Sequence, residues 1–191
     1  MSDYTAVREV TLALQGLLER EITHSSEPQL AAPIHLFSPK VMREKEQSGV
    51  SLWLYRVTRE ADHLNQPPQR VGASTLRQPP IPLTLSYLVT PMTGDPKDEQ
   101  SLLGKVVQVM NDHTIVRGSD VGSMLDGDGT VLRVLLDGLT LEDLARVWDV
   151  LKEPYQLSVA YLVHSIAIDS DRDAVLRPPV VHRGNPVEGD A

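Results

Sequence analysis

Three carboxylates at alternating positions are the part of this sequence that most resembles a metal site. Asp169, Asp171 and Asp173 match the first three ligand positions of a calcium-binding loop. The sixth position of such a loop needs glycine and holds Ala174, and the twelfth needs glutamate and holds Val180. Because the preceding segment also has the pattern of a strand instead of a helix, we interpret these carboxylates as a solvated strand end.

The six histidines form no metal-binding or catalytic pattern. No two of them are four residues apart, the spacing that places two imidazoles on one face of a helix. His164 could act as a base, but among apolar strand neighbours it is better interpreted as a hydrogen-bonded or exposed strand residue. The acidic pairs at 98–99 and 142–143 occupy the first turns of expected helices, where the helix dipole favours negative charge. We therefore predict no catalytic, cofactor-binding or metal-binding residue, no cofactor and no enzymatic activity.

Motifs for phosphate binding and nucleophilic catalysis are incomplete in the same way. Gly104 and Lys105 lack both the upstream glycine and the following Ser or Thr of a phosphate-binding loop. No serine has glycines two residues to each side, as a nucleophile elbow requires. The DGDG at 126–129 is typical of a turn before a strand. The absence of cysteine excludes disulfides, thiolate zinc sites and cysteine nucleophiles.

Composition indicates one soluble globular domain. The 191 residues are 41% hydrophobic and 23% charged, and aromatic residues make up 4%, so a core of Leu and Val is expected. A net charge of −8 repels phosphate backbones and argues against nucleic-acid binding. The N-terminus has neither a basic leader nor an apolar run, and no apolar stretch approaches the roughly 18 residues of a membrane span. We expect no signal peptide and no membrane-spanning segment.

The first half of the chain alternates helix and strand signals. Apolar residues recur with a period near 3.6 over residues 4–23, which predicts an amphipathic helix. A short strand between prolines is expected at 32–39. Residues 50–60 and 81–91 carry apolar residues on both strand faces, so we predict two central, neighbouring strands. The Pro- and Gln-rich segment 61–80 is long for a hairpin loop and is expected to project from the sheet.

The second half repeats this order. Asp95 as N-cap and Pro96 at the first helical position predict a helix that continues to about residue 112. Residues 130–139 favour a strand, and a helix stays open as the alternative. Thr140 and Asp143 resemble a capping box at the start of a helix that Pro154 prevents from continuing.

The buried stripe of that last helix is predicted to be Leu144, Val147, Trp148 and Leu151. A long strand is predicted to follow at 156–169, with Ile166 and Ile168 on or near the face opposite Tyr161. The expected architecture is a single α+β (mixed α/β) domain, a mixed β-sheet with about three helices packed on it, over residues 1–169. Residues 170–191, with three prolines, are expected to be an extended arm or a disordered tail.

Several segments together resemble a known family, the N-terminal domain of the cap, or tube-terminator, proteins of extracellular contractile injection systems. These phage-tail-like particles are of the virulence-cassette and antifeeding-prophage type. The resemblance covers about residues 4–169 and is carried by Tyr55, Arg56, Val57, Asn65, Pro82, Leu83, Leu85, Tyr87, Leu88, Thr90, Leu102, Leu103, Gly104, Trp148, Pro154, Tyr155, Leu157, Ser158 and Tyr161. Two departures are Thr114 after His113, where the family often has proline, and the lack of the long C-terminal extension of some members.

The resemblance implies a fold similar to phage tail terminators and a structural function. Family members form a six-fold ring that closes the end of the inner tube and sheath distal to the baseplate. The implied partners are other copies of the chain, as a hexamer, and the sheath and inner-tube proteins. The implied location is the cytoplasm during assembly and then the contractile particle. Whether the particle acts inside the cell or is released stays open.

Two questions stay open at this point. The alternative function is a small-ligand or calcium-binding module. Segments 61–80 and 170–191 are either contact arms that join a neighbour by strand addition or unattached flexible segments. The sequence does not distinguish which surfaces contact tube or sheath, nor the strand order.

Overall fold

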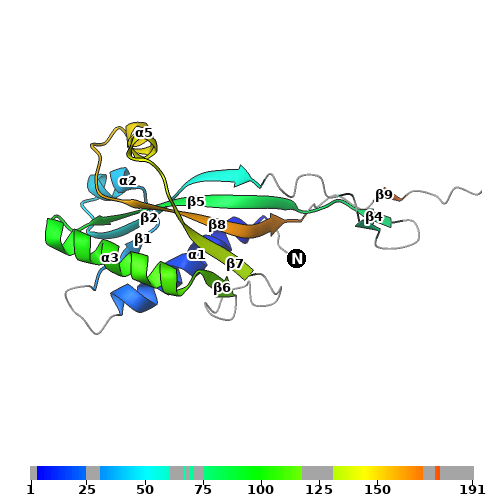
Figure 1. The fold of residues 1–191 in the computed structure, drawn as a ribbon, viewed down its shortest axis with the longest axis horizontal. Helices are drawn as coiled ribbons and strands as arrows, with labels where there is room; N and C mark the ends of the chain where they lie inside the picture. Colours follow the sequence, from blue (N-terminus) through cyan, green and yellow to red (C-terminus); the bar gives the residue numbers. More distant parts are fainter. Residues whose placement is uncertain are drawn as a thin grey trace, which may run out of the picture.

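A single mixed sheet with helices on both faces forms the body of the protein (Figure 1). The computed structural model describes residues 4–24, 31–60, 67, 69–70, 75–117, 131–169 and 175–176. Six strands pair in the order β1-β2-β5-β8-β7-β6, and every pair is antiparallel except β1 with β2. The bounds of these strands are β1 Ile34–His35, β2 Gly49–Arg59, β5 Ile81–Met92, β6 Ile115–Arg117, β7 Val131–Asp137 and β8 Val159–Ile168.

Four α-helices lie in the described part of the chain, one more than the approximate number predicted. They are α1 Ala6–Leu18, which continues into the π-helix η1 Glu19–Thr23, then α2 Pro39–Glu44, α3 Pro96–Asp112 and α5 Leu141–Leu151. In Figure 1, α1 and α3 lie on one side of the sheet and α5 on the other. None of these helices combines the length and hydrophobicity that crossing a bilayer requires.

The main core lies between the sheet and the helices α1, η1 and α3. Alternate residues of β5 and β8 point into it because successive side chains of a strand face opposite sides. The predicted buried face of α3 is confirmed, since Leu102, Val106, Val109 and Met110 are all buried there. The hydroxyl groups of Tyr87 and Thr11, 2.8 Å apart, join β5 to α1 inside this layer.

A β-bulge explains why one strand face was predicted wrongly. The β5–β8 register shifts between Leu83 and Leu85, where β8 has one residue more than β5. The extra residue reverses the alternation of the side chains beyond it. Ile166 and Ile168 therefore contact the same core as Tyr161, instead of lying on the opposite face.

The other face of the sheet carries a smaller apolar cluster beneath α5. Trp148 and Leu151 of α5 pack with Leu88 of β5, and the partly buried Leu144 and Val147 complete the predicted stripe. The indole N–H of Trp148 donates a hydrogen bond of 3.2 Å to Ser158. Half of the β5 residues on this face are polar but buried, namely Thr84, Ser86 and Thr90.

Helix ends follow local signals, with two differences from the prediction. The Thr140 hydroxyl accepts from the Asp143 N–H and donates to the Asp143 carboxylate, so the pair caps α5 without the reciprocal backbone bond of a full capping box. The helix ends at Lys152, which is left-handed at φ 56°, before Pro154 is reached. Helix α2, absent from the prediction, begins with Ser38 as N-cap and Pro39.

A second, three-stranded sheet extends the central strands beyond the body. It has the order β3-β4-β9, with β3 Gln69–Arg70, β4 Thr75–Arg77 and β9 Val175–Leu176. Since β4 precedes β5 and β9 follows β8, the β4–β9 ladder lies beyond the same end of the β5–β8 ladder. Figure 1 shows β4 and β9 well away from the six-stranded sheet. The described strands of segment 61–80 thus project as predicted, and β4 pairs with β9 of the C-terminal segment of the same chain.

Two buried tyrosines make stability depend on alkaline pH. Burial raises the pKa of Tyr87 far above its ordinary value of about 10, and the hydrogen bond with Thr11 lowers it by less. Burial raises the pKa of Tyr161 to about 12. Because both folded-state values exceed the unfolded value, this stability is fully present below about pH 10 and is lost as pH rises through the folded values.

We expect the free energy of unfolding to fall above about pH 10, and to fall less in Tyr161→Phe, which carries no phenol at that site. Urea titrations of both proteins at about pH 8 and about pH 11 measure the difference. Equal losses in the two proteins would contradict the assignment. Tyr4→Phe, at a site 85% exposed, is the matched control and should behave as the wild type.

Candidate assembly surfaces

Residues with reactive side chains are not assembled into a reaction centre in the described part of the chain. No three His, Asp or Glu residues converge there as metal ligands. Asp169 follows the last residue of β8, whereas Asp171, Asp173 and the turn at 126–129 lie outside the described residues. Gly104 and Lys105 lie within α3, as predicted, and the Lys105 ammonium donates to Gln108.

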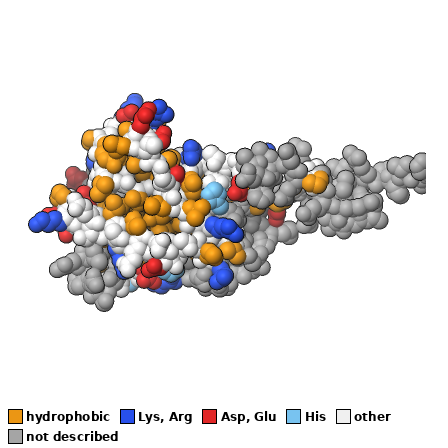
Figure 2. Space-filling view, in the orientation of Figure 1, with side chains coloured by type: hydrophobic (Ala, Val, Ile, Leu, Met, Phe, Trp, Pro, Cys, Tyr) orange, Lys and Arg blue, Asp and Glu red, His pale blue; other side chains and the backbone are white. Residues whose placement is uncertain are grey.

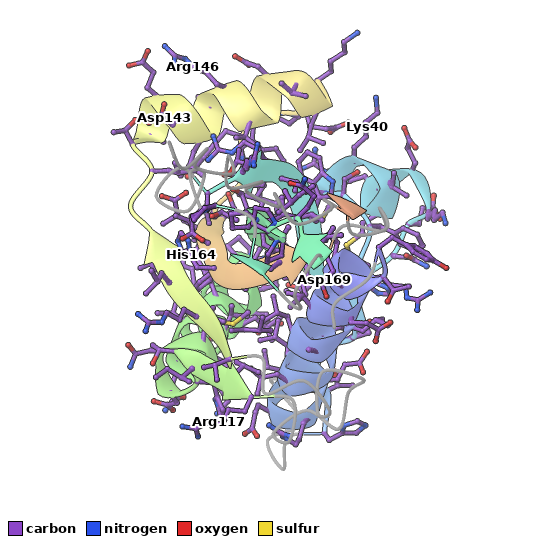
Figure 3. The ribbon with its side chains drawn as sticks, turned by 90° about the vertical axis from the view of Figure 1, so that its right-hand side faces the viewer. Lys40, Arg117, Asp143, Arg146, His164 and Asp169 are labelled. Carbon is purple, nitrogen blue, oxygen red and sulfur yellow. The ribbon has the colours of Figure 1, made fainter. Side chains whose placement is uncertain are left out.

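His164 has two polar neighbours, Thr84 and Glu60. The Thr84 hydroxyl lies 3.2 Å and the Glu60 carboxylate 3.4 Å from its ring, and both approach the same nitrogen, Nδ1. A relay from carboxylate through imidazole to a nucleophile uses the two different ring nitrogens. Figure 3 shows His164 beside the central strands. The prediction of a hydrogen-bonded strand histidine is confirmed.

An open depression of about 410 Å³ lies at the opposite end of the sheet, between α2 and the start of α3. Its polar groups hold adjacent segments together. The Glu99 carboxylate accepts from the backbone N–H groups of Thr93 and Gly94 and from the Gln156 amide. Arg43 pairs with Glu153 and also donates to Gln156, which joins α2 to the segment after α5. These contacts stabilise the loops at this end of the body.

Exposed apolar side chains gather near α5 and the strand that leads to it. Figure 2 shows hydrophobic atoms extending from α5 across the sheet below it. Leu135 of β7 is 48% exposed on this face of the sheet, and Leu141 and Val150 of α5 are 67% and 78% exposed. Tyr155 also lies partly exposed, edge-on to Trp148. A surface of this kind is typical of proteins that bind other proteins.

Charged residues on α5 lie on its outer side and pair with one another. The Arg146 guanidinium donates to Glu142 at 2.7 Å and lies 3.9 Å from Asp143. In Figure 3, Arg146 points away from the sheet. Exposed ion pairs between side chains of one helix contribute little stability, typically about 0.3–0.5 kcal/mol each. The attachment of α5 to the sheet therefore depends on its apolar stripe.

Comparison with solved structures gives the class of protein that has this fold. The PVC sheath/tube terminator of an extracellular contractile injection system, in its extended state, matches with a TM-score of 0.68 and 17% sequence identity, over 100% of this chain and 66% of that chain. The tube-terminating cap of the anti-feeding prophage matches with a TM-score of 0.60 and 16% identity, over 90% of this chain and 58% of that chain. The fold is thus that of tail-terminator caps. A search of curated proteins finds no match.

The family follows from the sequence itself. The family model described as the Pvc16 N-terminal domain matches residues 9–182. The chain belongs to the Pvc16 N-terminal domain family, and the resemblance stated from its motifs is confirmed. The chain spans 66% and 58% of the lengths of the two solved relatives.

The motif residues of the family have identifiable structural roles. Trp148, Tyr155 and Ser158 all belong to the attachment of α5, and Ser158 accepts the indole hydrogen bond. Sequence reasoning found these residues but not the β3-β4-β9 sheet. That sheet depends on which strands pair, and no residue pattern in the chain specifies that pairing.

Replacing Trp148 by Ala should release α5 while the main core persists. Large-to-small core substitutions of this type cost about 3–5 kcal/mol. Hydrogen exchange should show lost amide protection in α5 and retained protection in α3. Val150→Ala, on the exposed side of the same helix, is the matched control and should change stability by less than about 0.5 kcal/mol. A loss of protection that is equal in α3 and α5 would show that α5 does not detach independently.

Proposed function

We propose that this chain is the structural cap, or tail terminator, of a contractile injection system. In this role it forms a ring that closes the end of the inner tube and sheath distal to the baseplate and stops their polymerisation. The observation that carries the proposal is a terminator fold that extends over the whole chain, at a TM-score of 0.68, within the Pvc16 N-terminal domain family. The proposed role is structural and involves neither catalysis nor a cofactor.

The physical task explains what such a subunit needs. A polymer with head-to-tail contacts keeps one open end, and a terminator must match that end without recreating it. A body with apolar clusters on both faces of its sheet is stiff enough to present fixed surfaces. The polar cluster around His164 and the depression beside Glu99 fit this role, since their side chains join neighbouring segments.

The finer assignments are part of the same proposal. We propose a hexamer with sheath and inner-tube proteins as partners, assembly in the cytoplasm, and incorporation into the particle. Residues 1–169 would form the terminator body and residues 170–191 an arm. The arm's described strand, β9, pairs with β4 of its own chain, so the projecting β3-β4-β9 sheet is the unit proposed to reach a partner.

Length control of the particle tests this function. Without the chain, tubes and sheaths should grow to a broader and longer distribution of lengths, because no subunit closes the end. Supplying the purified protein should restore a narrow distribution, and a variant that ends at Asp169 should bind the end less well. Negative-stain electron microscopy measures the lengths directly.

The matched control is Asn111→Ala, at an exposed position of α3, which should restore lengths as the wild type does. Unchanged particle lengths in the absence of the chain would contradict the proposed function. Normal length control by the variant that ends at Asp169 would contradict only the role of the arm.

A further inference from the structure

We propose that the part of the sheet face left uncovered by α5 is a docking surface for an acidic amphipathic helix of another protein in the particle. We call this surface the strand patch. It consists of the side chains of β6, β7 and β8 that point to the α5 side of the sheet beyond α5 itself. The inference rests on the proposed function only for the source of the helix, a protein of the tube or sheath that the chain would close.

Helix α5 covers only one end of its face of the sheet. The row of side chains beneath it contains Trp53, Leu88, Ala160 and Asp137. Leu88 packs there on Trp148 of α5. In Figure 1 the strands continue beyond α5 toward β4 and β9, and none of the described helices lies above them there. The rows of side chains that follow are therefore left without a helix of this chain among the described residues.

Apolar side chains are exposed in these rows. Successive residues of a strand face opposite sides, and the main core receives Val116, Leu132 and Val134. The residues between them lie on the α5 side, where Ile115 is 51%, Val131 38% and Leu135 48% exposed. Ile115 is opposite Arg133 and thus diagonal to both of the others, and the partly buried Leu162 is opposite Leu135. The four apolar side chains form one continuous surface.

Arginines border this apolar surface on two sides. Arg133 lies between Val131 and Leu135 on the same face of β7, and Arg117 is opposite Val131. Both arginines are exposed. Arg56 belongs to the row of Leu135, and its Nε donates to Ser86 of β5 at 3.4 Å, which directs the side chain across β5 toward β8.

Carboxylates on this face are fewer and are engaged elsewhere. The Glu60 carboxylate lies 3.4 Å from the His164 ring, and Asp137 belongs to the row beneath α5. The strand patch is thus locally basic in a chain whose net charge is −8. Arginines around an apolar surface favour a partner that combines apolar side chains with carboxylates, which guanidinium groups bind through charge-assisted hydrogen bonds.

The size of the strand patch fits one helix. Val131 and Leu135 are about 13 Å apart along the strand, and β6 and β8 are about 10 Å apart across it. A contact of this size is far smaller than the roughly 1,200 Å² that a stable interface between globular proteins buries. A helix is about 10 Å wide and covers about 13 Å with nine residues, over which an amphipathic sequence presents apolar side chains at i, i+3, i+4 and i+7.

A second copy of this chain does not offer such a helix among the described residues. Helices α1 and α3 bury their apolar stripes in the main core, and α5 buries its own against β5. What the three helices leave exposed is mainly polar, such as Glu142 and Arg146 on the outer side of α5. The structure therefore favours a helix from a different polypeptide.

Two synthetic peptides test the strand patch in the free, full-length chain. Both are helices of about 15 residues with leucine at i, i+3, i+4 and i+7; one has glutamate beside the leucines and the other has lysine. A chain of net charge −8 should by itself favour the basic peptide. We expect the acidic peptide to bind at least about tenfold more tightly in fluorescence anisotropy, because the local arginines contact its glutamates. Equal binding, or tighter binding of the basic peptide, would overturn the inference.

Charge reversal locates the binding. Arg133→Glu should lose the preference for the acidic peptide, and Arg133→Gln, which removes the charge without reversing it, should lose part of it. Lys97→Glu, at an exposed position of α3, changes the net charge as Arg133→Glu does and should bind as the wild type. Circular dichroism should show all three variants folded, since both positions are exposed. Arginine variants that bind as Lys97→Glu does would also overturn the inference.

Photo-cross-linking in purified particles identifies the source of the helix. Leu135→p-benzoylphenylalanine should link to an acidic helical segment of another particle protein, which mass spectrometry of the digested product identifies. The same replacement of Leu12, 43% exposed on α1, is the matched control and should not link to that segment. A link from residue 135 to a second copy of this chain, or no link beyond that of the control, would overturn the inference.

These outcomes stay distinct from those of the proposed function. Normal control of tube length by a chain that binds both peptides equally would reject the strand patch and leave the cap role intact. Selective binding of the acidic peptide by a chain that does not control tube length would support the strand patch and reject the cap role.

Discussion

The antiparallel ladder between β5 and β8 is the interaction on which the other parts of the molecule depend. It runs through the middle of the sheet, and its side chains supply both apolar clusters, with Tyr87 and Tyr161 on one face and Leu88 on the other. The helices α1 and α3 cover the first face, and α5 covers part of the second. Since the ladder is buried on both faces, packing fixes the conformation of both faces of the sheet. Only the edges and ends of the sheet can then vary in conformation.

This division into closed faces and open edges suits a building block better than a reaction centre. The polar side chains that approach one another, such as His164 with Glu60 and Glu99 with Gln156, hold segments in place. Exposed apolar residues lie on β7 and α5, and β1 and β6 are the outer strands of the six-stranded sheet among the described residues. A terminator must contact copies of itself and the end of a polymer, and edges and exposed apolar surfaces can provide both kinds of contact.

Local signals in the sequence predicted most of the elements, because caps and periodic patterns act within a few residues. Asp95 and Thr140 cap the predicted helices, and the strand alternative for 130–139 is confirmed as β7. The facing of Ile166 was wrong because the bulge that reverses it results from pairing with β5, a distant segment. Helix α2 was missed although Ser38 and Pro39 mark its start, since its six residues give little periodic pattern. The strand order could not be predicted, because it is a property of the whole sheet.

The central claim is that this chain closes the end of a contractile particle as a ring. Cryo-electron microscopy of intact particles that carry a tagged copy of the chain tests it most directly. The account predicts ring-shaped density for the chain at the end distal to the baseplate, with the β5–β8 ladder inside each subunit and adjacent subunits in contact. Particles whose distal end lacks the chain, or that carry it at the baseplate or along the sheath, would contradict the account.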